Sequence, residues 1–152
     1  MLSHSSTGVP VVDAQEDFLR ARRAHVAARL VRRASVPRTL TDTAGMPRGS
    51  ARLEVIPLKA VVGTVEPTIT FDARFRPASE LVRARWERIA LAHRRGLALP
   101  PIRVLHGNDG YYVVDGRHRV SVALALGRRD IQVWVILMGL ILSSVSCCEE
   151  AV

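Results

Sequence analysis

The chain has 152 residues and a formal net charge of +8, from 22 Lys and Arg residues against 14 Asp and Glu residues. This length is enough for one domain with a hydrophobic core and excludes two such domains. Lys59 is the sole lysine, so arginine carries the charge, and its planar guanidinium binds phosphate groups through paired hydrogen bonds. The composition suits a phosphate-bearing partner. For most of these arginines, however, the favoured interpretation is a solvated surface cation.

A basic helix is predicted over residues 16–34, because small and apolar residues recur along one side at helical spacing. The apolar positions are Phe18, Ala21, Ala24, Ala28 and Val31, and the arginines are Arg20, Arg22, Arg23, Arg29, Arg32 and Arg33. Residues 35–50 place proline and glycine among serine and threonine, which is typical of a flexible linker. The favoured interpretation of the helix is a solvated element, packed lightly on the domain or partly disordered. The alternative is a weak nonspecific nucleic-acid contact through Arg20 to Arg33.

Two strands, a loop and a helix are predicted between the linker and residue 111. In chain order they are a strand that ends at Ile56-Pro57-Leu58, a loop over residues 71–77, an amphipathic helix over residues 79–95 and a strand that begins at Ile102. Trp86 lies on the apolar face of the helix and is expected in the core, and Gly96 ends the helix. Gly107 to Gly110 then forms a hairpin turn into the following strand.

The most informative stretch is residues 111–127, where a strand rich in Tyr and Val runs into a helix through Gly116. Glycine permits a tight turn there, and the free N–H groups of the new helix favour an anion. Arg117, His118 and Arg119 add positive charge on the first helical turn. Asp115 would bind a magnesium ion together with phosphate oxygens or cap the helix, and the two roles can coexist.

Asp115-Gly116-Arg117-His118-Arg119 resembles the Asp-Gly-His-His-Arg signature of the ParB-like and sulfiredoxin superfamily, and the order of elements from about Leu53 to Val135 is similar to that fold. The resemblance implies a single small α/β (α+β) domain over residues 51–137, with helices on a mixed sheet. It implies that Gly116, Arg117, His118 and Arg119 bind a nucleotide such as ATP, ADP or CTP, with Mg²⁺ at Asp115.

Differences between residues 115–119 and the motifs of individual branches indicate which branch of the superfamily the chain resembles most. Sulfiredoxins place a nucleophilic cysteine where Arg117 stands, whereas the two cysteines here are Cys147 and Cys148. Chromosome-partitioning proteins have Glu at the position of Arg117 and Arg at that of His118, and they continue into a helix-turn-helix DNA reader that is not expected here. The free serine kinases differ from this motif only at Arg117. The resemblance to them implies catalysis by Asp115 and an upstream acid, for which two candidates, Glu66 and Asp72, stay open.

Three functions follow as hypotheses. The first is a nucleotide-binding domain that transfers a phosphoryl group to a small acceptor, as a phosphotransferase or nucleotide hydrolase, or that only binds the nucleotide. The second is a non-catalytic accessory protein of chromosome partitioning; without a reader domain its DNA binding would be weak, nonspecific and strongly salt dependent. The third is a structural partner protein without a ligand.

The last part of the chain, residues 138–152, is an apolar tail. The run from Val133 to Leu142 is about half the roughly 20 residues that a membrane-spanning helix needs, so no insertion is expected. Residues 131–137 are predicted as the last strand, and residues 139–145 as a short packed helix or an exposed end that drives formation of a homodimer. Adjacent cysteines and the lack of a signal-peptide pattern indicate a cytoplasmic protein.

Overall fold

The computed structural model describes residues 6–40 and 50–137, which form a six-stranded mixed sheet with helices. The strands are β1 (Arg38–Thr39), β2 (Ala51–Pro57), β3 (Val61–Thr64), β4 (Ile102–His106), β5 (Tyr111–Asp115) and β6 (Asp130–Ile136), in the order β1-β3-β5-β4-β6-β2. The helices are α1 (Pro10–Leu30), α2 (Arg83–Arg94) and α3 (Arg117–Ala125), with 3₁₀ turns η1 (Leu58–Ala60) and η2 (Glu80–Val82). This arrangement confirms the predicted α/β class with a single small domain and a preceding helix.

The sheet contains three parallel and two antiparallel strand pairs. β3 pairs with β1 and β5 in parallel, and β4 pairs with β6 in parallel, whereas β4 with β5 and β6 with β2 are antiparallel. The β4–β5 pair is the hairpin predicted from the glycine turn, and β6 is the predicted last strand. β1 lies within the segment expected to be a linker. Residues 139–145, for which a helix or a sticky end was expected, lie outside the described residues.

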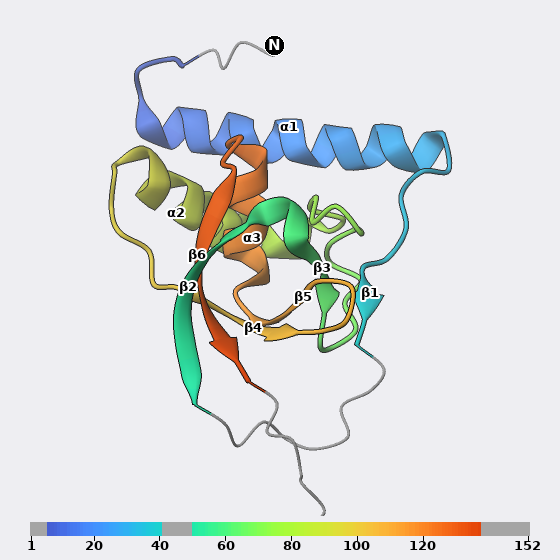
Figure 1. Ribbon diagram of the computed structural model, residues 1–152. Helices are drawn as coiled ribbons and strands as arrows, with labels where there is room; N and C mark the ends of the chain where they lie inside the picture. The colour runs from blue at the N-terminus through green and yellow to red at the C-terminus, as the bar shows by residue number, and fades with distance from the viewer. Residues whose placement is uncertain (1–5, 41–49, 138–152) are drawn as a thin grey trace, which may run out of the picture.

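Helix α3 lies between the sheet and the other two helices (Figure 1). Its Val120 and Ala123 belong to a buried cluster with the inward residues of the sheet, whereas its Val122 belongs to a second cluster with α1 and α2. The second cluster contains Trp86, whose indole Nε1 donates a 2.8 Å hydrogen bond to Ser121 Oγ, so its polar group is satisfied in the interior. The two clusters hold the start of α3 in a fixed position.

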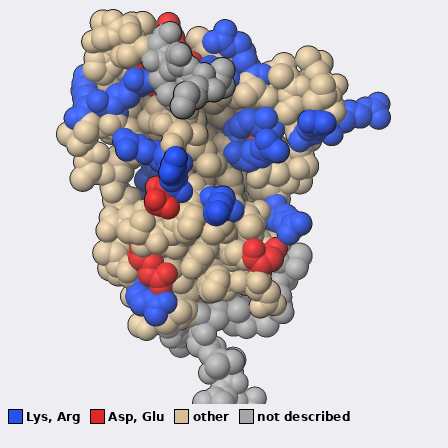
Figure 2. Space-filling model, turned by 45° about the horizontal axis from the view of Figure 1, so that its top comes forward, with Lys and Arg blue, Asp and Glu red and all other residues tan. Residues whose placement is uncertain are grey.

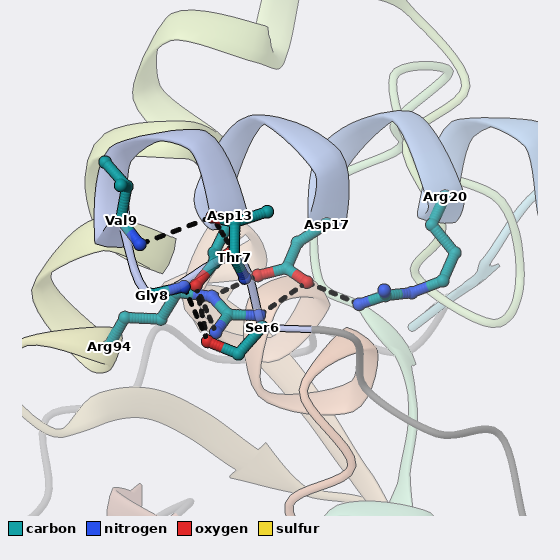
Figure 3. Close-up of polar contacts among 8 residues, drawn as sticks. All are labelled: Ser6, Thr7, Gly8, Val9, Asp13, Asp17, Arg20 and Arg94. Carbon is teal, nitrogen blue, oxygen red and sulfur yellow. Dashed lines mark hydrogen bonds and ion pairs between the residues drawn. The ribbon is translucent and has the colours of Figure 1, made fainter.

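Helix α1 begins at Pro10, earlier than the predicted Glu16, and it packs on the rest of the domain through the buried side chain of Phe18. Phe18 has 0% exposure, and its ring packs edge-to-face on Trp86 with centroids 5.6 Å apart. Beside it, the buried Asp17 carboxylate accepts two hydrogen bonds from the Arg94 guanidinium, at 2.6 and 2.9 Å (Figure 3). The basic helix is therefore held against α2 by an aromatic contact and a bidentate ion pair.

The chain just before α1 is fastened to the helix by Asp13. Its carboxylate accepts hydrogen bonds from the Thr7 backbone N–H and hydroxyl, both at 2.7 Å, and from Ser6 Oγ at 2.8 Å (Figure 3). The Thr7 hydrogen bonds are the main cause that lowers the pKa of Asp13 below its usual range. Asp13 is thus ionised at neutral pH and fixes the entry of α1.

Candidate functional site

The turn between β5 and α3 requires glycine. Gly116 has φ of 109°, a conformation that side-chain-bearing residues rarely adopt. A Cβ atom at this position would also lie 2.4 Å from Ile102 Cγ2 and 2.8 Å from Ile102 Cβ. The predicted strand, glycine turn and helix are confirmed, and close packing on β4 adds a second reason for the glycine.

The first turn of α3 has no side-chain cap. Gly116 is the N-cap residue and accepts a hydrogen bond from Val120 N–H, but no side chain accepts from the free N–H groups that begin the helix. The Asp115 carboxylate instead accepts a 2.8 Å hydrogen bond from Arg119 Nη2. The alternative that Asp115 caps the helix is therefore wrong, and the positive end of the helix is left open to a ligand.

A hollow of about 110 Å³ lies over this helix end. Its lining comes from three elements: the motif, the loop before α2, and α2 itself. Its lining includes Phe71, Arg85, Asp115, Arg117 and His118. Arg85 was not identified from the sequence, because its exposed position on α2 looks like any solvated arginine until the fold places it beside the motif.

His118 is held at the rim of the hollow by Phe71, with the two rings edge-to-face and their centroids 5.1 Å apart. Burial and, next to it, the positive charges of Arg85 and Arg117 together lower the pKa of His118 to about 4, against the opposing effect of the Asp115 carboxylate. His118 is consequently neutral at pH 7. Neither Arg85 nor Arg117 forms an ion pair within residues 6–40 and 50–137, so the hollow carries uncompensated positive charge.

Arg119, expected to bind phosphate, has partners within the protein. Its guanidinium donates to the carbonyl oxygens of Pro100 and Pro101, at 2.6 and 2.9 Å, and to Asp115. The side chain is only 14% exposed. Arg119 therefore fixes the loop before β4 and the Asp115 carboxylate, and its guanidinium is occupied before any ligand arrives.

The two upstream acids do not line the hollow. Asp72 is 2% exposed, and its carboxylate accepts hydrogen bonds from the backbone N–H groups of Arg74 and Arg76 and from Arg76 Nε. Its Oδ2 also lies 3.0 Å from His25 Nδ1. Burial acts to raise the pKa of Asp72, but the hydrogen bonds from His25 and Arg76 outweigh it and keep that pKa below its usual range. Glu66 is exposed on the loop after β3. The structure thus brings together the five motif residues and leaves out both upstream candidates.

Asp115 is the one carboxylate that lines the hollow among the described residues, and its side chain is 58% exposed. No group of three or more His, Cys, Asp or Glu side chains able to hold a metal occurs in that part of the chain. A single open carboxylate still fits Mg²⁺, which is commonly held by one or two acids together with phosphate oxygens and water. Any magnesium here would therefore depend on a bound phosphate for most of its ligands.

Two arginines of α1 lie close to acidic side chains. Arg20 pairs with Asp17, and Arg22 lies 3.4 Å from Glu80. Figure 2 shows Lys and Arg side chains in several separate groups over the upper half of the molecule, divided by uncharged residues. The helix contributes to packing through one side and to dispersed positive charge through the other.

No family model matches the chain, and neither a curated protein nor a solved structure matches it. The resemblance of the Asp115–Arg119 motif to the ParB-like and sulfiredoxin superfamily therefore stays a prediction. Among the described helices, none is long and apolar enough to cross a membrane.

Proposed function

We propose that the hollow at the start of α3 binds a phosphate group of a nucleotide. The observation that carries this proposal is the uncapped helix end facing two arginines that lack ion-pair partners in the described residues, Arg85 and Arg117. Backbone N–H groups, the helix dipole and two guanidinium groups then act on one anion. The combination is stronger than a helix end alone because the arginines come from different elements.

The size of the hollow restricts what it would hold. Its volume of about 110 Å³ suits a phosphate group, whereas pockets that enclose a whole small molecule usually have roughly 300 Å³ or more. The sugar and base would lie outside it, on the surface. Binding is better supported than phosphoryl transfer, because one carboxylate lines the hollow and neither Glu66 nor Asp72 joins it.

A thermal-shift and calorimetric titration with pyrophosphate, ATP, ADP and CTP tests the proposal, with and without Mg²⁺. A ligand at a hundred times its Kd should add about 2.7 kcal/mol of stability. Arg85→Gln and Arg117→Gln should each weaken binding by about tenfold to a hundredfold, the scale of one charge-assisted hydrogen bond. Arg88→Gln, an exposed arginine on the same helix as Arg85, is the matched control. A flat response to every one of these ligands would refute the proposal.

The magnesium contribution is tested separately with Asp115→Asn. Asparagine keeps the size of the side chain but removes the charge that a cation needs. We expect binding without Mg²⁺ to be unchanged or slightly tighter, since a negative charge near the phosphate is lost, and the gain from Mg²⁺ to disappear. A variant that responds to Mg²⁺ as the wild type does would show that Asp115 does not hold the ion.

A further inference from the structure

Strand β2 forms one edge of the sheet and is seven residues long. It pairs with β6 on one side, and no strand of the described residues pairs with its other side (Figure 1). An edge strand presents a row of backbone N–H and C=O groups that can pair with a further strand. The length of β2 makes it a full-size template for such pairing.

The β2 edge carries apolar side chains that face solvent. Leu53 is 45% exposed and Val55 is 68% exposed. Because side chains alternate along a strand and Ile56 is buried in the cluster that contains α3 residues, Leu53 and Val55 lie on the opposite face of the sheet. Leu53 stands across from Trp134 of β6, which is itself 39% exposed. An apolar strip therefore ends at the free edge.

The charges of β2 are complementary to those of a second copy of the same strand. Arg52 and Glu54 share the other face of the strand and form an ion pair with each other. In an antiparallel pairing of two β2 strands about a two-fold axis at Leu53, Arg52 lies across from Glu54 of the second copy, and Glu54 across from its Arg52. Leu53 then meets Leu53, and Val55 meets Ala51. Every cross-strand pair is thus apolar or of opposite charge.

Neighbouring registers lack this match. Moving the axis by one residue toward the N-terminus places Arg52 across from Arg52, and moving it by one residue toward the C-terminus places Glu54 across from Glu54. Like charges directly opposite each other are destabilising. Pro57, which has no N–H to donate, lies outside the five-residue segment 51–55 that the favoured register pairs.

We propose that this protein forms a symmetric dimer through antiparallel pairing of β2 with β2 of a second copy, centred on Leu53. A two-fold contact of this kind uses the same patch on both subunits. The sheet becomes continuous across the dimer, and the strips of Leu53, Val55 and Trp134 from both copies join on one face. The phosphate-binding proposal is independent of this interface.

Charge reversal tests the pairing by sedimentation equilibrium. Arg52→Glu places two Glu–Glu pairs across the axis, and Glu54→Arg places two Arg–Arg pairs there. Each variant alone should dimerise about tenfold more weakly than the wild type, at the upper part of the range for a pair of cross-strand contacts. Mixing the two variants should give a heterodimer tighter than either homodimer, because each strand then meets its opposite charge. Arg88→Glu, on α2, is the control for a charge reversal away from the edge and should dimerise as the wild type does.

The mixing step separates pairing from folding, since the intrastrand Arg52–Glu54 ion pair is lost in both variants and is not regained on mixing. A wild-type chain that stays monomeric up to about 1 mM, the weak end of measurable association, would overturn the proposal. Single variants that dimerise as the wild type does, or a mixture with no preferred heterodimer, would also overturn it. As a measurement without substitution, hydrogen exchange of the wild type should show β2 amides that become protected as protein concentration rises; concentration-independent exchange would count against the dimer.

Discussion

Replacing Phe18 with alanine tests whether the basic N-terminal helix is part of the folded core. Phe18 has 0% exposure, packs on Trp86 and belongs to the cluster shared by α1, α2 and α3. Removing a buried phenylalanine costs about 3–5 kcal/mol, from the lost transfer free energy and the cavity left behind. That is a large part of the roughly 5–15 kcal/mol that stabilises a typical domain.

Urea unfolding followed by tryptophan fluorescence measures this loss, because Trp86 lies directly against the deleted ring. Leu19→Ala is the matched control: it is the next residue on α1, is 40% exposed, and should change the free energy of unfolding by about 0.5 kcal/mol or less. If Phe18→Ala costs less than about 1 kcal/mol, α1 is not docked as described, and the helix belongs with a flexible N-terminal segment.

The docking of α1 also changes how a nucleic-acid contact should be tested. Deleting residues 1–50 would uncover Trp86 and the second core cluster, so a loss of DNA binding would not identify the contact. Point substitution avoids this problem. Arg23, Arg29, Arg32 and Arg33 form no ion pair within the described residues, and reversing them to Glu leaves Phe18 in place. Equal DNA binding by that variant would exclude these four arginines, two on α1 and two directly after it, as the contact.

Three further predictions concern the motif. Gly116→Ala should destabilise the fold by at least about 2 kcal/mol in urea unfolding, because it combines a strained φ with a 2.4 Å approach to Ile102; stability equal to that of the wild type would show that the turn relaxes freely. Arg119→Ala should lower stability by about 2 kcal/mol through its lost hydrogen bonds to backbone carbonyls, and Arg119→Lys should not restore it, because one ammonium cannot replace the guanidinium fork. Since folding lowers the pKa of His118 from 6.5 to about 4, the unfolded chain binds the proton more readily between these values, and stability should fall as the pH falls from about 6.5 to 4. His118→Gln should reduce that pH dependence in unfolding measurements without abolishing it, because the pKa of His93 is also lowered, by burial and by Arg128; an unchanged slope would contradict the assignment.

The parts of the fold that the sequence predicted depend on local chemistry. The β5–Gly116–α3 junction follows from strand-forming residues, one glycine and a helical pattern that are adjacent in the chain. Long-range contacts decided the rest. The role of Asp72 depends on His25 of α1, 47 residues away in sequence, and the docking of α1 depends on the Asp17–Arg94 pair, 77 residues apart. Pattern and spacing carry no information about either pair, so the sequence alone predicts neither the buried role of Asp72 nor the close packing of α1.

The neighbouring basic residues of the motif make different contacts in the structure. Arg117, His118 and Arg119 are consecutive in the first turn of α3, but their side chains have different partners in the described residues. All three residues line the hollow. The Arg119 guanidinium donates hydrogen bonds to the carbonyls before β4, whereas Arg117 forms no ion pair within the described residues. Arg85 supplies the second unpaired guanidinium from α2. The proposed anion binding at this turn would therefore depend on the packing of α2 against α3. A substitution that shifts α2 should weaken the proposed phosphate binding even though it leaves the motif unchanged.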